Sequence, residues 1–264
     1  MDAVRVGFDI GPLHGPRSGV GFAVDALHGA LATRDDITLV DYLVSFRAHP
    51  GPAVRRLPLP AAIAHRCWAH TQHPQADRWL HGVQVVHGTN YVVPPGRLPR
   101  LITVHDCWFL RRPDLAGHAV TRSGQAMRRA IAGGAAVHAV SQTTADEVRD
   151  LFPDASVHVV HWGALPLMPA PPIAPIPDLV GRRFIVAIGT LERRKNLPAL
   201  VEAFGRLAGA HPDLDLVLAG KDGDDSTAID AAVDALGPAS RRVLFAGRVD
   251  ERTRSWLLHH ATVL

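Results

Sequence analysis

Short apolar runs alternate along this chain with longer segments in which apolar residues recur every three or four positions. The short runs are typical of buried strands, and the longer pattern is typical of helices that pack one face on a sheet. We predict strands at residues 4–10, 37–44, 83–87, 101–105, 136–140, 157–161, 184–188, 214–218 and 243–245. We predict helices at residues 20–31, 121–132, 144–151, 197–207, 228–236 and 251–260. Strands and helices in alternation predict an α/β protein with doubly wound parallel sheets.

A proline-rich segment interrupts this alternation. Prolines stand at positions 166, 169, 171, 172, 175 and 177, which disfavours a helix and favours an extended linker over 166–178. We therefore expect a first Rossmann-like domain over 1–165 and a second domain over 179–264. The second domain is shorter than usual, and its last residues, 261–264, have the apolar character of an opening strand. We expect this domain to be incomplete and the chain to be a fragment.

The composition limits the classes of function. Hydrophobic residues make up 47% of the 264 positions, and the formal net charge of +3 is too small to suggest nucleic-acid binding. No apolar stretch is long enough to span a bilayer, and no signal-peptide pattern is visible. Cys67 and Cys107 lack metal or redox spacing, which fits a reducing compartment without excluding one disulfide. We expect a cytoplasmic protein, and no metal site among the 16 scattered histidines.

The strongest candidate for chemistry is the turn that follows the predicted strand 184–188. Gly189 begins this turn, and a basic run over 193–195 precedes Asn196, which is a candidate N-cap of the next helix. Free backbone N–H groups at a helix start, together with added cations, make a suitable site for a diphosphate. A solvated basic loop is the other interpretation of this segment.

A glycine-rich turn follows the first predicted strand. It spans residues 11–21 and places Gly19 and Gly21 at the start of a helix, where backbone N–H groups can approach a phosphate or a sugar. A flexible turn without a ligand is the alternative. Asp41 lies 20 residues after Gly21, at the distance expected of the ribose-binding acid in a dinucleotide site. This spacing keeps an NAD-dependent oxidoreductase open as a second function.

Polar residues stand at the ends of two further predicted strands. His105 and Asp106 follow one strand, and His87 and Asn90 follow or end another. In open α/β sheets the carboxyl ends of the strands form the edge where ligands bind. An imidazole at this edge can hydrogen-bond a sugar hydroxyl or polarise a reacting group. Capped strand ends are the structural alternative.

Taken together and in this order, these motifs resemble those of the family-4 glycosyltransferases, the family of glycosyl transferases group 1. The matching segments are residues 15–21, 87–91, 103–109, 139–143, 189–196, 216–220 and 245–250. The Gly-Thr-Leu-Glu-Arg-Arg-Lys-Asn sequence over 189–196 is the most specific of them. The resemblance implies a GT-B architecture, in which two Rossmann-like domains face each other across a cleft. It also implies transfer with retention of anomeric configuration and without a metal ion.

The resemblance also implies roles for the candidate residues. Arg194 and Lys195 would hold the donor diphosphate and stabilise the charge on the leaving group. The other implied roles are catalysis at the transferred sugar by His105 and Asp106, approach to the diphosphate by Gly19 and Gly21, contact with the nucleotide and sugar by Gly189, Gly220 and Val249, and contact with the acceptor by His87 and Asn90. No cofactor is implied beside the UDP- or GDP-linked donor. The implied acceptor is a saccharide or a lipid-linked molecule, with peripheral contact to the inner face of a membrane.

Two other functions remain open at this point. The family carries a pair of glutamates that would lie after residue 264, so the chain could bind a sugar nucleotide without turnover. The NAD-dependent oxidoreductase is the other. Binding of a nucleoside diphosphate but not of NADH would separate the transferase from the oxidoreductase.

Overall fold

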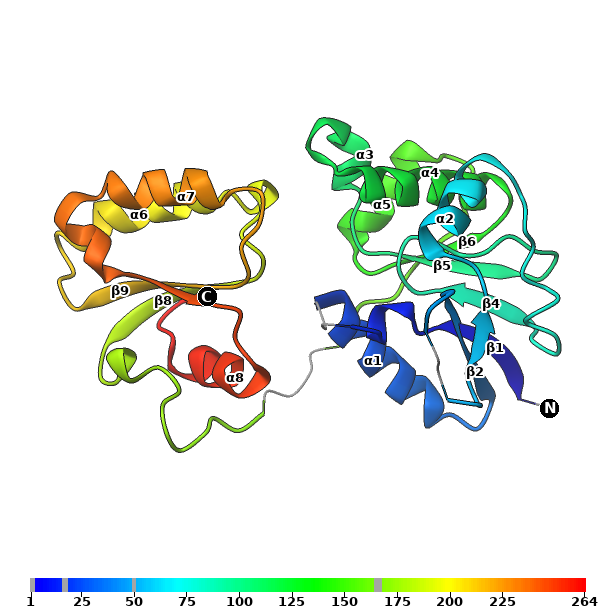
Figure 1. Cartoon of the computed structure of the whole chain (residues 1–264), viewed down its shortest axis with the longest axis horizontal. Helices are drawn as coiled ribbons and strands as arrows, with labels where there is room; N and C mark the ends of the chain where they lie inside the picture. Colours follow the sequence, from blue (N-terminus) through cyan, green and yellow to red (C-terminus); the bar gives the residue numbers. More distant parts are fainter. Residues whose placement is uncertain (1–2, 16–18, 49–50, 164–167) are drawn as a thin grey trace. The chain divides into compact units, whose positions relative to one another are not determined.

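The computed structural model describes residues 3–15, 19–48, 51–163 and 168–264 of the chain. These residues belong to two compact units, 1–165 and 166–264 (Figure 1). Each unit contains its own sheet, and every strand pairing in both sheets is parallel. The predicted α/β class with parallel sheets is therefore confirmed.

The first unit contains a seven-stranded sheet in the order β3-β2-β1-β4-β5-β6-β7. Its strands are β1 Val4–Asp9, β2 Ile37–Val44, β3 Arg55–Leu57, β4 Val85–Gly88, β5 Arg100–Val104, β6 Ala136–Ala139 and β7 Val157–Val159. The direction of strand addition reverses between β1 and β4. Their carboxyl ends therefore form the topological switch point, which is where open α/β sheets bind ligands.

Helices cover the two faces of this sheet (Figure 1). The helices are α1 Gly19–Ala32, α2 Ala61–His70, α3 Trp108–Arg111, α4 His118–Ala132 and α5 Gln142–Leu151, with short 3-10 turns at Gly11–Leu13 and Pro113–Leu115. On one face, Val24 of α1 packs with Phe8 and Leu43. On the other face, Trp68 of α2 and Met127 of α4 belong to the larger core.

The sequence pattern did not predict helix α2. Its only buried residues are Ala64 and Trp68, which are four positions apart, and two residues are too few to show a helical period. Strand β3 and helix α3 were also missed, because three or four residues are too few to show a period. Helix α2 is nevertheless important here, because it forms one wall of a cavity at the switch point.

The second unit contains a three-stranded sheet in the order β10-β9-β8. Its elements are β8 Arg183–Ile188, β9 Leu214–Ala219, β10 Val243–Gly247, α6 Leu197–Ala208, α7 Ser226–Asp234 and α8 Glu251–His260, with 3-10 turns at Pro177–Leu179, Arg193–Lys195 and Gly237–Arg242. Helices α6 and α7 lie on one side of this sheet and α8 on the other (Figure 1). Phe204 and Ile229 belong to the core under α6 and α7, and Trp256 belongs to the core under α8.

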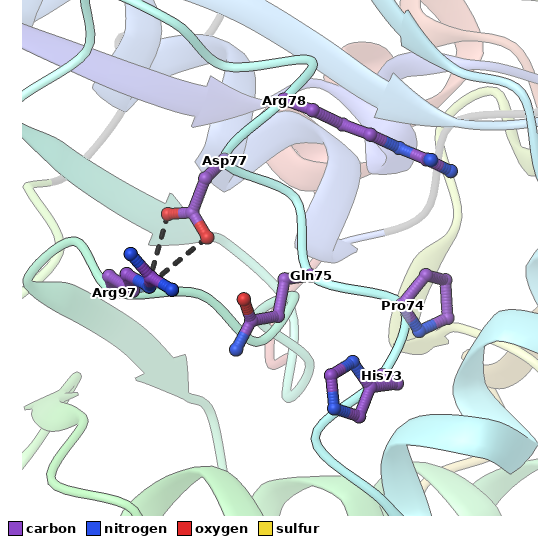
Figure 2. Close-up of a pocket in the computed structure, with 6 residues that line it drawn as sticks. All are labelled: His73, Pro74, Gln75, Asp77, Arg78 and Arg97. Carbon is purple, nitrogen blue, oxygen red and sulfur yellow. Dashed lines mark hydrogen bonds between the residues drawn. The ribbon is translucent and has the colours of Figure 1, made fainter.

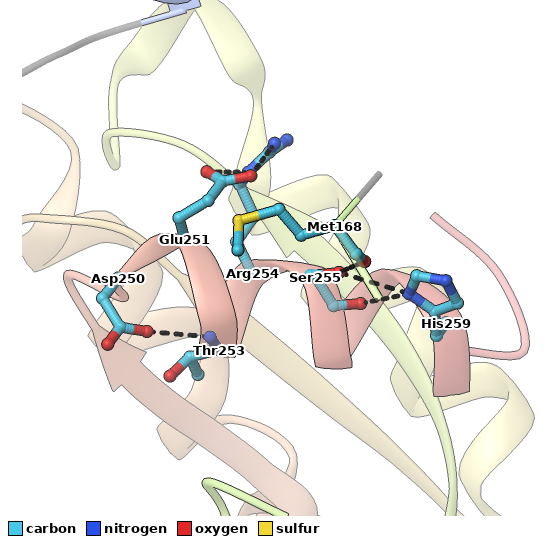
Figure 3. Close-up of polar contacts among 7 residues, drawn as sticks. All are labelled: Met168, Asp250, Glu251, Thr253, Arg254, Ser255 and His259. Carbon is cyan, nitrogen blue, oxygen red and sulfur yellow. Dashed lines mark hydrogen bonds and ion pairs between the residues drawn. The ribbon is translucent and has the colours of Figure 1, made fainter. Parts of the chain in front are cut away.

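The proline-rich segment is held against α8 (Figure 3). Ser255, fully buried in α8, donates its hydroxyl to the carbonyl oxygen of Met168. Ala170 and Ala174 pack against the core around Trp256. This segment is therefore packed on the second unit rather than hanging free of it.

Residues 261–264 return to the sheet after α8. The backbone N–H of Val186 donates to the carbonyl oxygen of Val263 at 2.9 Å, and that of Thr262 donates to Phe184 at 2.8 Å. Val263 forms a parallel bridge with Ile185. The apolar run over 261–264 thus joins the sheet through one isolated bridge and does not form the expected strand.

Candidate functional site

The turn after β4 is shaped by one glycine and one strained residue. A Cβ at Gly88 would lie 2.0 Å from the carbonyl oxygen of Val92, so only glycine allows the chain to double back here. Tyr91 adopts a left-handed conformation with φ 59°, which is unfavourable for a bulky side chain. Its hydroxyl donates to Asp106 at 2.9 Å, and its N–H donates to the Thr103 carbonyl at 3.0 Å. These bonds hold the turn in the strained conformation.

His105 lies at the carboxyl end of β5, as predicted. Its Nε2–H donates to the carbonyl oxygen of Thr89 at 3.1 Å, because a carbonyl can only accept. The Nδ1 atom is therefore an acceptor in the neutral ring. Burial lowers the pKa of His105, which keeps the ring neutral at physiological pH. The ring stacks on Trp162 at 6.0 Å between centroids, and the Thr144 hydroxyl donates to the His105 carbonyl at 3.2 Å.

Asp106 is not the hydrogen-bond partner of His105. Its carboxylate accepts from the hydroxyl of Tyr91, and the ring of Tyr91 lies edge-on to His105 at 5.4 Å. Burial, reinforced by the Asp106 charge, raises the pKa of Tyr91. Asp106 thus fixes the turn that carries Asn90 and Tyr91.

His87 is a buried residue of the sheet rather than part of its edge. It is 4% exposed, and its Nε2 lies 2.8 Å from the hydroxyl of Thr103, which lies 3.0 Å from Nδ1 of His138. His138 donates from Nε2 to the Val160 carbonyl at 2.9 Å, so Nδ1 of His138 is an acceptor. Thr103 therefore donates its hydroxyl to His138 and accepts from Nε2–H of His87. Burial lowers the pKa of His87 to about 3. The side chain of His87 is therefore buried in the sheet and, contrary to the expectation, does not face a sugar acceptor.

A cavity of about 260 Å³ lies at the switch point of the first unit. Its lining includes Asp9 from the end of β1, Tyr42, Ala61, His65, Trp68 and Asn90. Oδ1 of Asp9 accepts from the backbone N–H of Gly11 at 2.8 Å, while burial raises the pKa of Asp9 to about 7. Oδ1 of Asn90 is buried and has no hydrogen-bond partner among the described residues.

A second cavity of about 380 Å³ lies elsewhere on the first unit (Figure 2). Asp77 accepts there from the backbone N–H of Arg97 at 3.0 Å, and the guanidinium of Arg78 lies 3.8 Å from the ring centroid of Trp79. None of the predicted site residues lines this cavity.

In the second unit, the ends of the three strands meet closely. A Cβ at Gly189 would lie 2.0 Å from Nζ of Lys195, so the ammonium lies against the Gly189 backbone. A Cβ at Gly220 would lie 1.9 Å from the Gly189 carbonyl oxygen, and Gly220 N–H donates to the Gly247 carbonyl at 2.7 Å. Burial lowers the pKa of Lys195, and the neighbouring Arg194 adds to this shift. The predicted residues Gly189, Lys195 and Gly220 are therefore brought together.

The basic turn before α6 has carboxylate partners that the sequence analysis did not single out. Nε of Arg194 lies 2.8 Å from Glu192, and Asp224 accepts from the backbone N–H of Arg193 at 3.1 Å. Asn196 stands at the N-cap position in a left-handed conformation with φ 50°, but its side chain makes no capping bond. Asn196 is thus at the predicted N-cap position, but its side chain does not accept a hydrogen bond from the first turn of the helix.

The other predicted residues lie apart from these clusters. Val249 is half-buried and packs on the core beside α8. Gly19 begins α1 and Gly21 is buried in its first turn, while residues 16–18 of the glycine-rich turn lie outside the described residues. The carboxylate of Asp41 faces α1, where Nε2 of His28 lies 2.9 Å away. Asp41 of β2 is thus paired with His28 of α1, which removes the argument that Asp41 binds a ribose.

Three residues that the sequence analysis did not assign to the site belong to these clusters. Asp9 could have been found, because it is an acid at the end of a strand on the ligand-binding edge. Tyr91 and Trp162 gave no comparable signal, since they approach His105 from a turn and from the segment after β7.

Comparison with known proteins shows a family similarity for the C-terminal part of the chain and a shared fold for the whole of it. Residues 175–264 match the family model described as Glycosyl transferases group 1. No curated protein sequence matches the chain. Among the described residues, no helix combines the length and apolar character needed to cross a bilayer.

Solved structures match nearly the whole chain. WaaG, a glycosyltransferase involved in lipopolysaccharide biosynthesis, is similar with a TM-score of 0.64 and 14% identity, over 98% of this chain and 73% of its own. Sucrose-phosphate synthase from Thermosynechococcus elongatus gives 0.66 and 15%, over 99% and 74%. Alr3699/HepE from Anabaena, solved with UDP and glucose, gives 0.63 and 16%, over 98% and 73%. The predicted GT-B-like fold is confirmed by these structures, and residues 175–264 are similar to the glycosyl transferases group 1 family.

Proposed function

We propose that this chain is a family-4 glycosyltransferase that moves a hexosyl group from a UDP- or GDP-linked sugar to an acceptor hydroxyl. The transfer would proceed with retention and without a metal ion. The acceptor would be a saccharide or a lipid-linked molecule reached at the cytoplasmic face of a membrane. The observation that carries the proposal is the close contact of Lys195 with Gly189 at the end of β8, inside the segment that matches the family.

The β8–α6 turn has the chemistry that a diphosphate requires. The ammonium of Lys195 and the guanidinium of Arg194 lie in one short turn before a helix of 12 residues. The helix start adds backbone N–H groups and positive dipole. Cations fixed beside the leaving nucleoside diphosphate would stabilise the negative charge that develops there. The close contact between Gly189 and Gly220 would let backbone groups of both residues reach the nucleotide and the sugar. Val249 would contact them from the loop after β10.

In the first unit, the neutral His105 would contact the transferred sugar. Nδ1 of this ring is an acceptor, because Nε2–H is committed to the Thr89 carbonyl. It can therefore accept a hydrogen bond from a sugar hydroxyl, whereas a protonated ring could not. Asp106 would act through Tyr91 as a positioning residue. Gly19 and Gly21 would approach the donor from the start of α1.

The solved relatives support this choice over the oxidoreductase. Alr3699/HepE was solved with UDP-glucose and is similar to this chain with a TM-score of 0.63. By contrast, Asp41, the acid expected in a dinucleotide site, lies in the middle of β2 and is paired with His28 of α1.

Isothermal titration with UDP, GDP and NADH tests the proposal. We expect a nucleoside diphosphate to bind and NADH not to bind. The double variant Arg194→Ala/Lys195→Ala should weaken that binding by about tenfold or more, since charge-assisted contacts contribute ~1.5–3 kcal/mol each. Arg183→Ala is the matched control, because Arg183 pairs with Asp213 at the opposite end of β8 and should leave the affinity unchanged. Equal affinity in the folded double variant would overturn the assignment.

A further inference from the structure

The cavity of about 380 Å³ on the first unit lies at the amino ends of the strands (Figure 2). Its lining comes from the loops that precede β4 and β5, namely His73, Pro74, Gln75, Asp77, Arg78 and Arg97. The loop before β4 is tied to the starts of two further strands, because Arg55 donates to the His81 carbonyl at 2.6 Å and Arg5 donates to the Gly82 carbonyl at 2.8 Å. Since the strands are parallel, His105 at the carboxyl end of β5 lies at the opposite edge of the sheet.

The backbone around this cavity is fixed by contacts with the rest of the unit. The N–H of Ala76 donates to the Pro95 carbonyl at 2.8 Å, which joins the two loops. Nε1–H of Trp68 donates to the Pro74 carbonyl at 3.0 Å, which joins the first loop to α2. Ala76 and Leu80 are buried in the core. The lining side chains are therefore carried by an anchored frame.

The carboxylate of Asp77 belongs to this frame. Its Oδ1 and Oδ2 lie 3.0 and 3.2 Å from the backbone nitrogen of Arg97, whose N–H they accept (Figure 2). A Cβ at Gly96 would lie 2.8 Å from Oδ1, so the carboxylate rests against the Gly96 backbone. Asp77 also interacts electrostatically with Arg100. The negative charge of the lining is therefore engaged by the chain itself.

The cations of the cavity are not engaged in this way. Among the described residues, neither Arg78 nor Arg97 has its guanidinium paired with a carboxylate. The guanidinium of Arg78 lies 3.8 Å from the ring centroid of Trp79, and this cation–π contact fixes its direction. The imidazole of His73 and the amide of Gln75 add further hydrogen-bond donors to the lining. Donors thus outnumber the available acceptors.

A lining of this kind suits a phosphate group. A guanidinium presents a planar fork of N–H donors that matches two oxygens of a phosphate, and such charge-assisted bonds are strong. Apart from the Pro74 ring, the lining residues are polar or charged, which disfavours an apolar ligand. The volume of about 380 Å³ lies within the ~300–1,000 Å³ of small-molecule sites, so there is room for a small organic group beside the phosphate.

We propose that this cavity binds the phosphate group of a small phosphomonoester through the guanidinium groups of Arg78 and Arg97, with His73 and Gln75 donating to the remaining oxygens. The site does not depend on the proposed transferase function, because it shares no residue with the candidate site and lies at the opposite edge of the sheet from His105. Its ligand is therefore an additional one, separate from the sugar donor and the acceptor.

Isothermal titration at constant ionic strength tests the inference, with glycerol 3-phosphate and glucose 6-phosphate as probes. The 264-residue chain carries Arg194→Ala/Lys195→Ala in these titrations, so that the basic turn of the second unit does not contribute. Adding Arg78→Ala/Arg97→Ala should weaken ester binding by about tenfold or more. Both side chains are exposed, and the bond from Arg97 to Asp77 comes from the backbone, so this variant keeps the frame intact.

Two further variants separate a specific site from general attraction by positive charge. Arg56→Ala/Arg66→Ala is the matched control, because it removes the same charge from two exposed arginines that line neither cavity and should leave the affinity unchanged. Asp77→Asn keeps an oxygen that accepts from Arg97 and loses only the charge, so it should tighten ester binding by about threefold.

Each outcome decides the inference. Ester binding that is lost in Arg78→Ala/Arg97→Ala and retained in the control supports it. Equal affinities in these two variants, no binding of either ester, or equal binding of glucose and glucose 6-phosphate overturns it. Binding only to vesicles of phosphatidic acid in phosphatidylcholine overturns the small-molecule class. The transferase proposal is judged separately, because UDP and GDP binding is measured with Arg194 and Lys195 intact.

Discussion

Replacing Asp9 by asparagine should stabilise the first unit at neutral pH. Asp9 is half-buried at the end of β1, where desolvation of the carboxyl raises its pKa from 3.8 to about 7 despite the hydrogen bond from Gly11. Asparagine keeps an oxygen that accepts from Gly11 and cannot ionise. The change therefore removes the charge and little else.

The pKa of Asp9 sets the size and the direction of this effect. Because the folded pKa is raised, the native state holds the proton more tightly than the unfolded chain between about pH 4 and pH 7. The wild type therefore loses stability as the pH rises through this interval. A shift of about three units, at 1.36 kcal/mol each, corresponds to about 4 kcal/mol above pH 7 and to almost nothing below pH 4. We expect Asp9→Asn to exceed the wild type by up to that amount at about pH 8 and to equal it at about pH 4.

Urea unfolding followed by tryptophan fluorescence measures this difference. Trp256 is the one tryptophan of the second unit, so a Trp256→Phe background restricts the signal to the first unit. Asp36→Asn is the control, because the exposed Asp36 pairs with Arg34 and its pKa is lowered rather than raised. Parallel pH profiles for Asp9→Asn and the wild type, or a less stable variant at about pH 8, would refute the reasoning.

Three further predictions follow from named contacts. The folded pKa of His87 is depressed to about 3, so the wild type should lose about 1.4 kcal/mol per pH unit as the pH falls from about 6.5 toward 3, and His87→Gln should flatten this acid limb in urea titrations. Glu192→Gln frees the guanidinium paired with it and should tighten UDP or GDP binding by up to about fivefold in calorimetry; weaker binding would contradict this. Gly220→Ala should destabilise the second unit by more than about 2 kcal/mol, whereas Gly209→Ala, where a Cβ meets nothing within 4 Å, should not; equal unfolding curves would show that the strand ends can separate.

The sequence predicted the architecture well because burial is periodic. The run at 184–188 became β8, and the spacing over 197–207 became α6 with Val201 and Phe204 inside. Placement of His105 and Gly189 at the carboxyl ends of parallel strands followed directly from this pattern. The sequence predicts that these two residues lie on the ligand-binding edge of a sheet, but it does not predict their hydrogen-bond partners.

The details of the site depended on tertiary contacts that the sequence does not show. His87 and Asn90 are three positions apart in one motif, yet they have different surroundings. The His87 side chain is buried and hydrogen-bonded to Thr103, whereas Asn90 lines a cavity. The strained residue Tyr91 follows Asn90 directly, and its hydroxyl is bonded to Asp106, which comes after a different strand. A pattern of residue types along the chain carries no information about such a bond.

Two unfavourable features of the first unit meet in the same cavity. A carboxyl at position 9 lowers stability at neutral pH, and a carboxamide at position 90 leaves a buried oxygen without a donor. Folding alone would favour an apolar or satisfied pair at these positions, since either change removes a penalty. Strain at Tyr91 adds a third penalty in the turn that presents Asn90. Residues that oppose stability together, at the switch point of a parallel sheet, are expected where a ligand supplies the missing donors. A gain in stability in both Asp9→Asn and Asn90→Leu, measured by urea unfolding, would therefore show that these two residues are not kept for folding.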